Sequence, residues 1–211
     1  MTRDIWAVVP VKELAHAKQR LESVFTPHAR RQFVLAMLAD VLAALKAVPD
    51  LAGTVVVTID ADVAAHARDA GVRVLTDGAG NGYSGAVNAA AGVLAREGRG
   101  GMLAVPADIP LATAAEFTRL LRDHPRGRAI SLAPAHDGRG TNAVLLTPPD
   151  AMPLEYEGDS FARHLRRAQD ANLPIARQRL SGVSVDIDLP ADLDFLRRHA
   201  TQTGSGRALA F

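Results

Sequence analysis

Cysteine is absent from the 211-residue sequence, which excludes disulfide bonds and thiolate metal sites. Neither sign of charge dominates, since 24 Lys and Arg stand against 23 Asp and Glu. A chain without a charge excess has no general attraction for nucleic acid or an anionic membrane, so any anion site must be local. No apolar run approaches the length of a bilayer, and the first residues lack a signal-peptide pattern. We therefore expect a cytoplasmic protein that binds neither nucleic acid nor membrane.

The loop after the first apolar run lacks the glycine patterns that often hold nucleotide phosphates. Residues 12–21 contain neither GxxxxGK[ST] nor GxGxxG, which counts against a P-loop enzyme and a dinucleotide oxidoreductase. The chain has no GxSxG nucleophile elbow, and its seven histidines are scattered without metal-ligand spacing. We therefore expect neither serine-hydrolase chemistry nor a histidine-based metal site.

Short β-rich runs alternate with helix-period segments along the chain. Strands are predicted at residues 5–11, 54–59, 72–75, 102–105, 130–133, 143–147 and 175–180. Helices are predicted at residues 27–48 (with Thr26 as N-cap), 62–70, 86–97, 113–123, 160–171 and 190–199. This alternation predicts one α/β domain over residues 1–200, with a mostly parallel, Rossmann-like sheet covered on both faces. We also expect a small inserted flap at about 133–160 and a flexible tail at 201–211.

The first candidate site is the basic loop after the first strand. Lys12, Lys18 and Arg20 lie within nine residues, at the carboxyl end of that strand. Open α/β sheets bind ligands at this edge, and Lys and Arg side chains offset the charge of a triphosphate. From spacing alone, a solvated basic loop is an equal alternative.

The second candidate is Asp108, in a turn held by Pro106 and Pro110 after the strand at 102–105. An aspartate at a strand's carboxyl end is well placed to hold Mg²⁺ over phosphates, since Mg²⁺ takes one or two carboxylates and completes its shell with water and substrate oxygens. The alternative is that Asp108 caps the helix that begins near Thr113.

A third candidate lies near the end of the chain, where Asp186 and Asp188 are two residues apart. In an extended segment both carboxylates project to the same side, and they repel each other unless a cation lies between them. Together with Asp108, the pair would form a divalent-metal site for Mg²⁺.

A fourth group of residues could bind the second substrate. Thr141 and Asn142 follow a glycine-containing loop, and Glu157 and Gly158 precede Ser160 at the start of a predicted helix. Backbone N–H groups at a helix N-terminus favour an anion, so a phosphate or carboxylate could bind here. Simple helix capping by Ser160 is the alternative.

The glycine-rich stretch at 78–85 is a weaker candidate. Gly82 and Gly85 would allow a nucleotide base or ribose to approach closely, and Asn88 follows in the predicted helix. An ordinary flexible loop explains the same composition.

In sequence order, these features resemble a known family. The motifs are VPVKxLxxAKxRL, PADIP, GTN, YxxxSFxxH and DIDxPxDL, and they span Val9 to Leu193. This order is similar to that of the guanylyltransferases of deazaflavin coenzyme biosynthesis, which act on 2-phospho-L-lactate or phosphoenolpyruvate. The resemblance implies a nucleotidyltransferase fold of the GT-A-like type, GTP as donor, Mg²⁺ as cofactor and release of pyrophosphate. It also implies that Lys12, Lys18 and Arg20 bind the triphosphate, that Asp108, Asp186 and Asp188 bind the metal, and that the acceptor lies near Thr141 and Ser160.

The chain departs from the family pattern at two places. Glu157 stands where the family usually has a glycine whose backbone contacts the acceptor, which predicts a different acceptor such as a phosphoglycerate-like acid. The segment GYSGAVNAA differs from the GLNAA-type stretch of the family. A molybdenum-cofactor or sugar-phosphate nucleotidyltransferase and a non-catalytic nucleotide-binding protein remain as alternatives. The sequence leaves the oligomeric state open, with a homodimer as one alternative.

Overall fold

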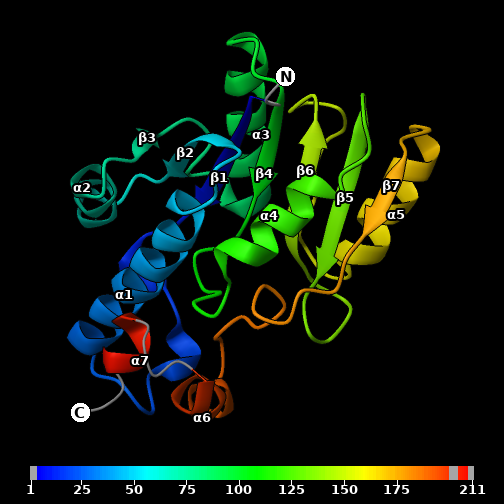
Figure 1. Ribbon diagram of the computed structural model, residues 1–211. Coiled ribbons are helices and arrows are strands. Elements are labelled where there is room, and N and C mark those ends of the chain that lie inside the picture. Colours follow the sequence, from blue (N-terminus) through cyan, green and yellow to red (C-terminus); the bar gives the residue numbers. More distant parts are fainter. Residues whose placement is uncertain (1–3, 200–203, 209–211) are drawn as a thin grey trace.

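The computed structural model describes residues 4–199 and 204–208. Seven strands form one sheet in the order β3-β2-β1-β4-β6-β5-β7 (Figure 1). The strands are β1 (Ile5–Pro10), β2 (Leu51–Val57), β3 (Arg73–Leu75), β4 (Gly101–Ala104), β5 (Ala129–Pro134), β6 (Thr141–Thr147) and β7 (Ile175–Arg177). The helices are α1 (Pro27–Lys46), α2 (Ala61–Asp69), α3 (Gly82–Arg96), α4 (Ala114–Arg122), α5 (Ser160–Asp170), α6 (Pro190–His199) and α7 (Gly204–Ala208), with 3-10 helices η1 (Leu14–His16) and η2 (Gln19–Leu21).

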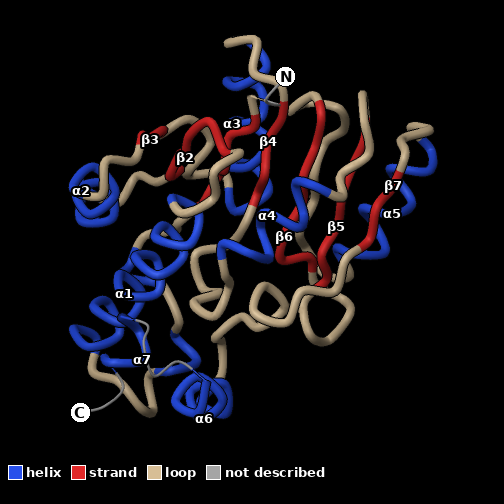
Figure 2. Tube along the Cα trace, in the orientation of Figure 1, coloured by secondary structure: helices blue, strands red, loops and turns tan. Residues whose placement is uncertain are grey.

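The sheet is mostly parallel, which confirms the predicted α/β class. β1 pairs in parallel with β2 and β4, whereas β6 is antiparallel to both β4 and β5. Because β6 lies inside the sheet, Thr141–Thr147 is not part of an inserted flap, and that part of the flap prediction is wrong. β5 and β6 are joined by a short turn, and a short turn can connect only antiparallel neighbours. The loops that follow β1 and β4 meet at the end of the sheet where the chain leads into α6 (Figure 2).

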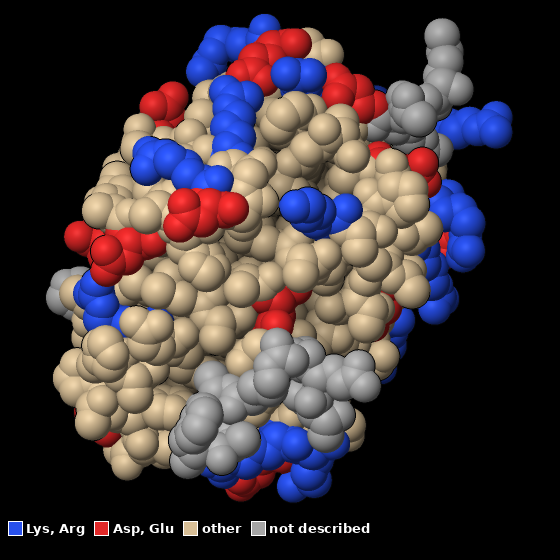
Figure 3. Space-filling view, turned by 60° about the vertical axis from the view of Figure 1, so that its left-hand side comes forward, with Lys and Arg blue, Asp and Glu red and all other residues tan. Residues whose placement is uncertain are grey.

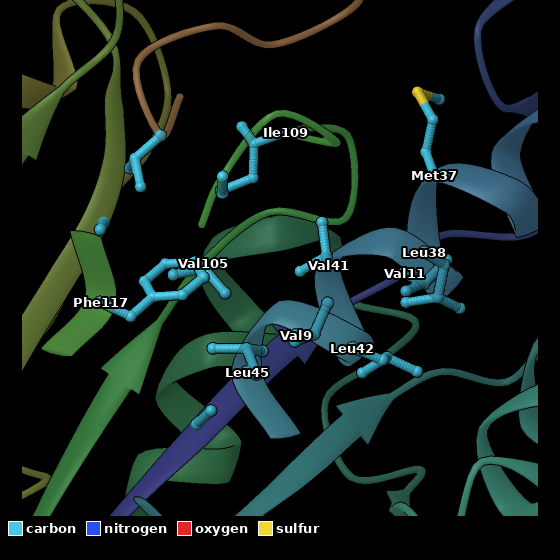
Figure 4. Close-up of a cluster of buried hydrophobic side chains, with 14 of the residues drawn as sticks. Val9, Val11, Met37, Leu38, Val41, Leu42, Leu45, Val105, Ile109 and Phe117 are labelled. Atoms are coloured by element: carbon cyan, nitrogen blue, oxygen red, sulfur yellow. The ribbon is translucent and has the colours of Figure 1, made fainter. Parts of the chain in front are cut away.

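Alternating side chains of the strands build two separate cores. Ala7 and Val9 of β1 belong to the core shared with α1, α2, α4 and α6, and Val8 belongs to the core shared with α3 and α5. This alternation follows from the two-residue period of a strand. Figure 4 shows Val41 and Leu45 of α1 near Val9 in the first core. The helices therefore cover both faces, as expected.

Local sequence signals set the helix starts. The Thr26 side chain accepts a hydrogen bond from the Ala29 amide at 3.2 Å, as its predicted capping role requires. Thr113 forms a capping box with Glu116 at the start of α4, so Asp108 does not cap that helix. The alternative prediction, that Asp108 serves as the cap of this helix, is therefore wrong.

The glycine-rich segment differs from the prediction, because α3 begins at Gly82 rather than at residue 86. The loop at 78–81 folds back onto this helix. A Cβ on Gly78 would lie 2.5 Å from the Cβ of Ala89 and 2.7 Å from the carbonyl oxygen of Gly85. The glycine at 78 is thus explained by close packing of backbone against helix.

The end of the chain also differs from the expected flexible tail. The backbone amides of Gly204 and Ser205 donate to the Asp40 carboxylate of α1, at 2.6 and 2.9 Å. This part of the tail is a short helix held against α1, and residues 201–203 and 209–211 lie outside the described residues. Within the described chain, none of the helices combines the length and the apolarity that a membrane span needs.

Candidate functional site

Lys18 joins two of the predicted carboxylates at the carboxyl edge of the sheet. Its Nζ lies 2.5 Å from Asp108 Oδ2 and 2.5 Å from Asp188 Oδ1. The three residues come from the loop after β1, the loop after β4 and the segment before α6, which are far apart in the sequence. The structure therefore assembles one cation from the basic loop and one carboxylate from each acidic motif.

Backbone interactions hold these three segments in place. Lys18 adopts the left-handed conformation between η1 and η2, with φ of 52°. The amide of Ile187 donates to the backbone oxygen of Asp108 at 2.9 Å, which ties the two acidic segments together. The Asp192 carboxylate accepts from the amides of Asp188 and Leu189, so Asp192 supports the first turn of α6.

The electrostatics of the site favour the ion pairs. Burial by itself would lower the pKa of Lys18, but the carboxylates of Asp108 and Asp188 outweigh it and raise that pKa above its usual value. Burial, together with the negative charge of Asp108, raises the pKa of Asp186. Lys18 is therefore charged at neutral pH, and its charge offsets part of the local negative potential.

The predicted three-carboxylate metal site is not formed. Among residues 4–199 and 204–208, no three His, Asp or Glu side chains are grouped so that they could hold a metal ion. Asp186 instead accepts from the Asn142 amide at 3.3 Å, and its Oδ1 lies 3.8 Å from His136 Nδ1. The Lys18 ammonium lies between the other two carboxylates, those of Asp108 and Asp188, where the sequence predicts a divalent ion.

One carboxylate oxygen nevertheless fits a cation. Asp108 Oδ1 is buried, and within the described part of the chain it has no hydrogen-bond partner. A buried carboxylate oxygen without a donor is costly unless a cation or a donor meets it. Oxygen ligands of this kind suit Mg²⁺, so Asp108 and Asp188 are the pair that could hold the ion.

A cavity of about 290 Å³ lies beside the lysine bridge, and its lining includes Lys12, Lys18, Tyr83, Asp108 and Asp188. The predicted residue Arg20 is exposed in η2 and is not among the described residues that line this cavity. The basic loop thus directs two of its three cations into one cavity.

A larger cavity, of about 540 Å³, lies near Asp186 and includes Arg119, His136 and Arg179 in its lining. We place the chemistry in the smaller cavity because it contains the lysine bridge and borders Asp108. Figure 3 shows one face of the molecule, on which acidic and basic side chains are interspersed, in keeping with the net charge of +1.

A second polar cluster lies between β6 and α5. Ser160 Oγ donates to Thr141 Oγ1 at 3.1 Å, and His164 Nδ1 lies 3.1 Å from the same oxygen. His164 Nε2 accepts from the Glu155 amide at 3.1 Å. The structure therefore brings Thr141 and Ser160 together, as expected, and adds His164, which the sequence analysis did not place in a site.

The predicted anion site at the start of α5 is not supported by the backbone. The amides of Ser160, Phe161 and Ala162 already donate to Gly158 O, Arg139 O and Asp159 Oδ1. The first-turn N–H groups are thus paired within the protein, and Asp159, not Ser160, is the N-cap. Side-chain hydroxyls, and not backbone amides, are the donors that this cluster could offer.

Glu157 faces α3. Ser84 Oγ lies 2.9 Å from each of its carboxylate oxygens and also accepts from the Tyr156 amide. Hydrogen bonds from its own backbone amide and from Ser84 lower the pKa of Glu157. Gly158, with φ of +63°, provides the left-handed turn that follows. The structure thus gives Glu157 a partner other than an acceptor phosphate.

The predicted nucleotide contact of Asn88 is not supported. Its Nδ2 donates to Leu154 O at 2.7 Å and its Oδ1 accepts from Leu154 N at 2.9 Å. Both ends of the amide are therefore engaged in holding the 148–159 segment against α3. Gly82 has φ of +73° and nothing within 4 Å of an added Cβ, whereas Gly85 packs against Asn81. Space near Gly82 is compatible with the predicted close approach of a nucleotide.

Aromatic rings connect the two clusters. Tyr83, which lines the cavity beside Lys18, packs edge-on against Tyr156 with ring centroids 4.6 Å apart, and Tyr156 packs against His164 at 5.0 Å. Sequence reasoning missed all three as site residues. The available signal was the spacing of Tyr156, Ser160 and His164, because Ser160 and His164 lie four residues apart and share one face of a helix.

Comparison with known proteins shows the family of the chain. The CofC family model, described as guanylyl transferase CofC like, matches residues 5–209. The phosphoenolpyruvate guanylyltransferase of Sphaerobacter thermophilus is 39% identical over 194 residues, which cover 92% of this chain and 93% of that protein. The 2-phospho-L-lactate guanylyltransferase of Methanothermobacter thermautotrophicus is 32% identical, with 93% and 86% covered.

Among solved structures, 4-diphosphocytidyl-2C-methyl-D-erythritol synthase superposes with a TM-score of 0.63. Its sequence identity is 18%, and the alignment covers 93% of this chain and 98% of that one. A likeness at this identity shows the nucleotidyltransferase fold alone. The family match and the full-length relatives go further: the chain belongs to the CofC-like guanylyl transferase family.

Proposed function

We propose that the protein transfers GMP from GTP to a small phosphorylated acid, phosphoenolpyruvate or 2-phospho-L-lactate, and releases pyrophosphate. The observation that carries the proposal is the Lys18 bridge to Asp108 and Asp188 in a cavity at the carboxyl edge of the sheet. The named activities of the relatives supply both substrates. The partnered position of Glu157 removes the reason to expect that it repels an acceptor phosphate, so a phosphoglycerate-like acid is not favoured.

The cavity provides groups for a triphosphate. A lysine ammonium has three N–H donors, and Asp108 and Asp188 account for two of those on Lys18. The third N–H can donate to a phosphate oxygen without breaking either ion pair. Lys12 lines the same cavity and adds a second positive charge. Both lysines would stabilise negative charge as pyrophosphate departs.

Asp108 and Asp188 would hold Mg²⁺, with Asp108 Oδ1 as the oxygen that lacks a partner among the described residues. A divalent cation there would neutralise charge on the phosphates and orient them. Asp186 is left out of this proposal, because it is bound to Asn142.

The chemistry asks little of the protein beyond positioning. A phosphate oxygen of the acceptor attacks the α-phosphorus of GTP, and the bond between that phosphorus and the bridging oxygen of pyrophosphate breaks. The acceptor phosphate is already ionised at neutral pH, so no general base is required. In agreement with this, His164 is fully buried, and burial together with Arg167 and Arg163 lowers its pKa to about 4.

A pyrophosphate-release assay tests the proposal. The purified protein would be incubated with each of the four NTPs and with phosphoenolpyruvate, 2-phospho-L-lactate or 3-phosphoglycerate, in Mg²⁺ or in EDTA. We expect turnover with GTP and one of the first two acids in Mg²⁺ alone, with the guanylylated product identified by mass spectrometry.

The matched controls are Asp108→Asn, which should be inactive, and Asp50→Asn, an exposed aspartate away from the site, which should be active. Release of pyrophosphate from CTP in preference to GTP, or no release with any pair, would contradict the proposal.

A further inference from the structure

The hydrogen bonds of His164 fix which ring nitrogen carries the proton. A neutral imidazole has one N–H and one acceptor nitrogen. Nε2 receives the Glu155 amide at 3.1 Å and must therefore be the acceptor, since a backbone N–H can only donate. The proton is then on Nδ1, which donates to Thr141 Oγ1 at 3.1 Å. The backbone thus dictates the tautomer of the ring.

The surroundings keep the ring neutral. Burial, together with the charges of Arg167 and Arg163, lowers the pKa of His164. Glu155 contacts the ring through its backbone amide, and its carboxylate is paired with both of those arginines on α5. Tyr156 packs edge-on against the ring, and Thr141 from β6 is uncharged. Protonation would also place a hydrogen on Nε2, where it would face the N–H of Glu155, so that two donors would meet without an acceptor.

The tautomer leaves one hydroxyl hydrogen in excess. Thr141 Oγ1 has two lone pairs, and it receives His164 Nδ1–H and the Ser160 hydroxyl. Its own O–H then has no acceptor among residues 4–199 and 204–208. If the hydrogen between the hydroxyls points the other way, the O–H of Ser160 is left over in its place. In both cases the pair must donate, and Thr141 is the more exposed, at 6% against 1%.

We propose that His164 is a positioning residue that commits the Thr141–Ser160 hydroxyl pair to donate a hydrogen bond to an anionic oxygen of the phosphorylated acid. This inference rests on the proposed function and adds a role to a residue outside the predicted site. The first-turn amides of α5 are already paired, so this hydroxyl is the donor that the cluster retains for an anion. A pair that can only donate prefers an ionised oxygen over a hydroxyl or an amine.

A double-mutant cycle separates positioning from a general structural role. Thr141→Val removes the hydroxyl at nearly constant shape, and His164→Leu removes the donor that orders it. Loss of a hydrogen bond to a charged group predicts that each variant raises the KM for the acid by about tenfold to a hundredfold. The KM for GTP should stay within about twofold. Because His164 acts through Thr141, adding His164→Leu to Thr141→Val should change the acceptor KM by less than about twofold.

Conservative variants guard against a folding defect. His164→Asn places an amide near the position of Nδ1 and should recover most of the acceptor affinity, and Thr141→Ser should do the same. His28→Leu, at an exposed histidine of α1, is the matched control for the loss of an imidazole. Additive effects in the double variant, or an equal rise in the KM for GTP, would overturn the proposal.

The tautomer can be measured without turnover. Nitrogen-15 NMR of the imidazole groups should show His164 as the neutral Nδ1–H form from pH 8 to about pH 5. An Nε2–H tautomer would refute the inference even in an active enzyme. If instead no phosphorylated acid supports turnover while the Nδ1–H form is present, calorimetric titration with phosphoenolpyruvate decides. Binding weakened by Thr141→Val keeps the inference and rejects only the proposed reaction, and binding unchanged by that variant rejects the inference.

Discussion

Replacing Lys18 by methionine tests the central ion pairs most directly. The change keeps a long side chain and removes the ammonium between Asp108 and Asp188. Two carboxylate oxygens that each lie 2.5 Å from one nitrogen are at most about 5 Å apart. At an effective dielectric constant of about 20, two unit charges at that distance repel by about 3 kcal/mol. The Asp188 side chain is 44% exposed, so solvent screening reduces this figure and a loss of about 1–2 kcal/mol is expected.

Urea unfolding in EDTA and in Mg²⁺ measures this effect. In EDTA the Lys18→Met protein should be less stable than wild type by that amount. In Mg²⁺ it should recover more stability than wild type gains, because a divalent cation can replace the missing charge. The control is Lys46→Met, at an exposed lysine that ends α1. If wild type and Lys18→Met are equally stable in EDTA, the electrostatic reasoning is wrong. If Mg²⁺ stabilises both to the same extent, the assignment of the metal to Asp108 and Asp188 is wrong.

Four further outcomes are expected. Asp108→Asn should lower turnover by at least about a hundredfold while thermal unfolding stays cooperative, because a neutral amide is a poor ligand for Mg²⁺; near wild-type turnover would remove Asp108 from the site. The folded pKa of His164, about 4, lies below its unfolded value of about 6.5, so its stability contribution is present above pH 6.5 and is lost as the pH falls toward 4. Urea unfolding should show that the free energy of unfolding falls by at most about 3 kcal/mol over this pH range because of His164, and this fall should be absent in His164→Asn. Asn88→Ala should cost about 1–3 kcal/mol of unfolding free energy, because the Leu154 amide and carbonyl lose their partners, and should leave the KM for GTP nearly unchanged. Glu157→Gly should leave the ranking of acceptor acids unchanged in the pyrophosphate assay, since a serine of α3 already binds its carboxylate; a new ranking would restore Glu157 as a specificity residue.

The sequence by itself determined the architecture and placed the basic loop and the Asp108 turn of the candidate site at one edge of the sheet. Alternating strand and helix patterns allow few arrangements other than a layered α/β sheet, and parallel strands bring their carboxyl ends to one edge. For that reason the sequence alone predicts that the loop of Lys18 and the turn of Asp108 lie at the same edge. Thr26 was recognised as a cap because capping depends on residues within one turn.

The tertiary structure decided which candidate side chains are available to a ligand. Asn88 and Ser160 carry suitable groups, yet their partners Leu154 and Thr141 lie 66 and 19 residues away in sequence. Asp186 turns from the expected metal site to Asn142, 44 residues away. Such pairings depend on the exact packing of loops, which no periodicity records.

For His164, too, the sequence determines one property and the tertiary structure another. Its helical spacing from Ser160 is written in the sequence, whereas the nitrogen that carries its proton is set by the backbone amide of Glu155. That amide belongs to the 148–159 segment, which Asn88 helps to hold against α3. Local patterns fix what each segment becomes, because they depend on neighbours in the chain. Hydrogen-bond partners across segments are fixed by burial, which forces each polar group to find whichever partner the folded chain brings within reach.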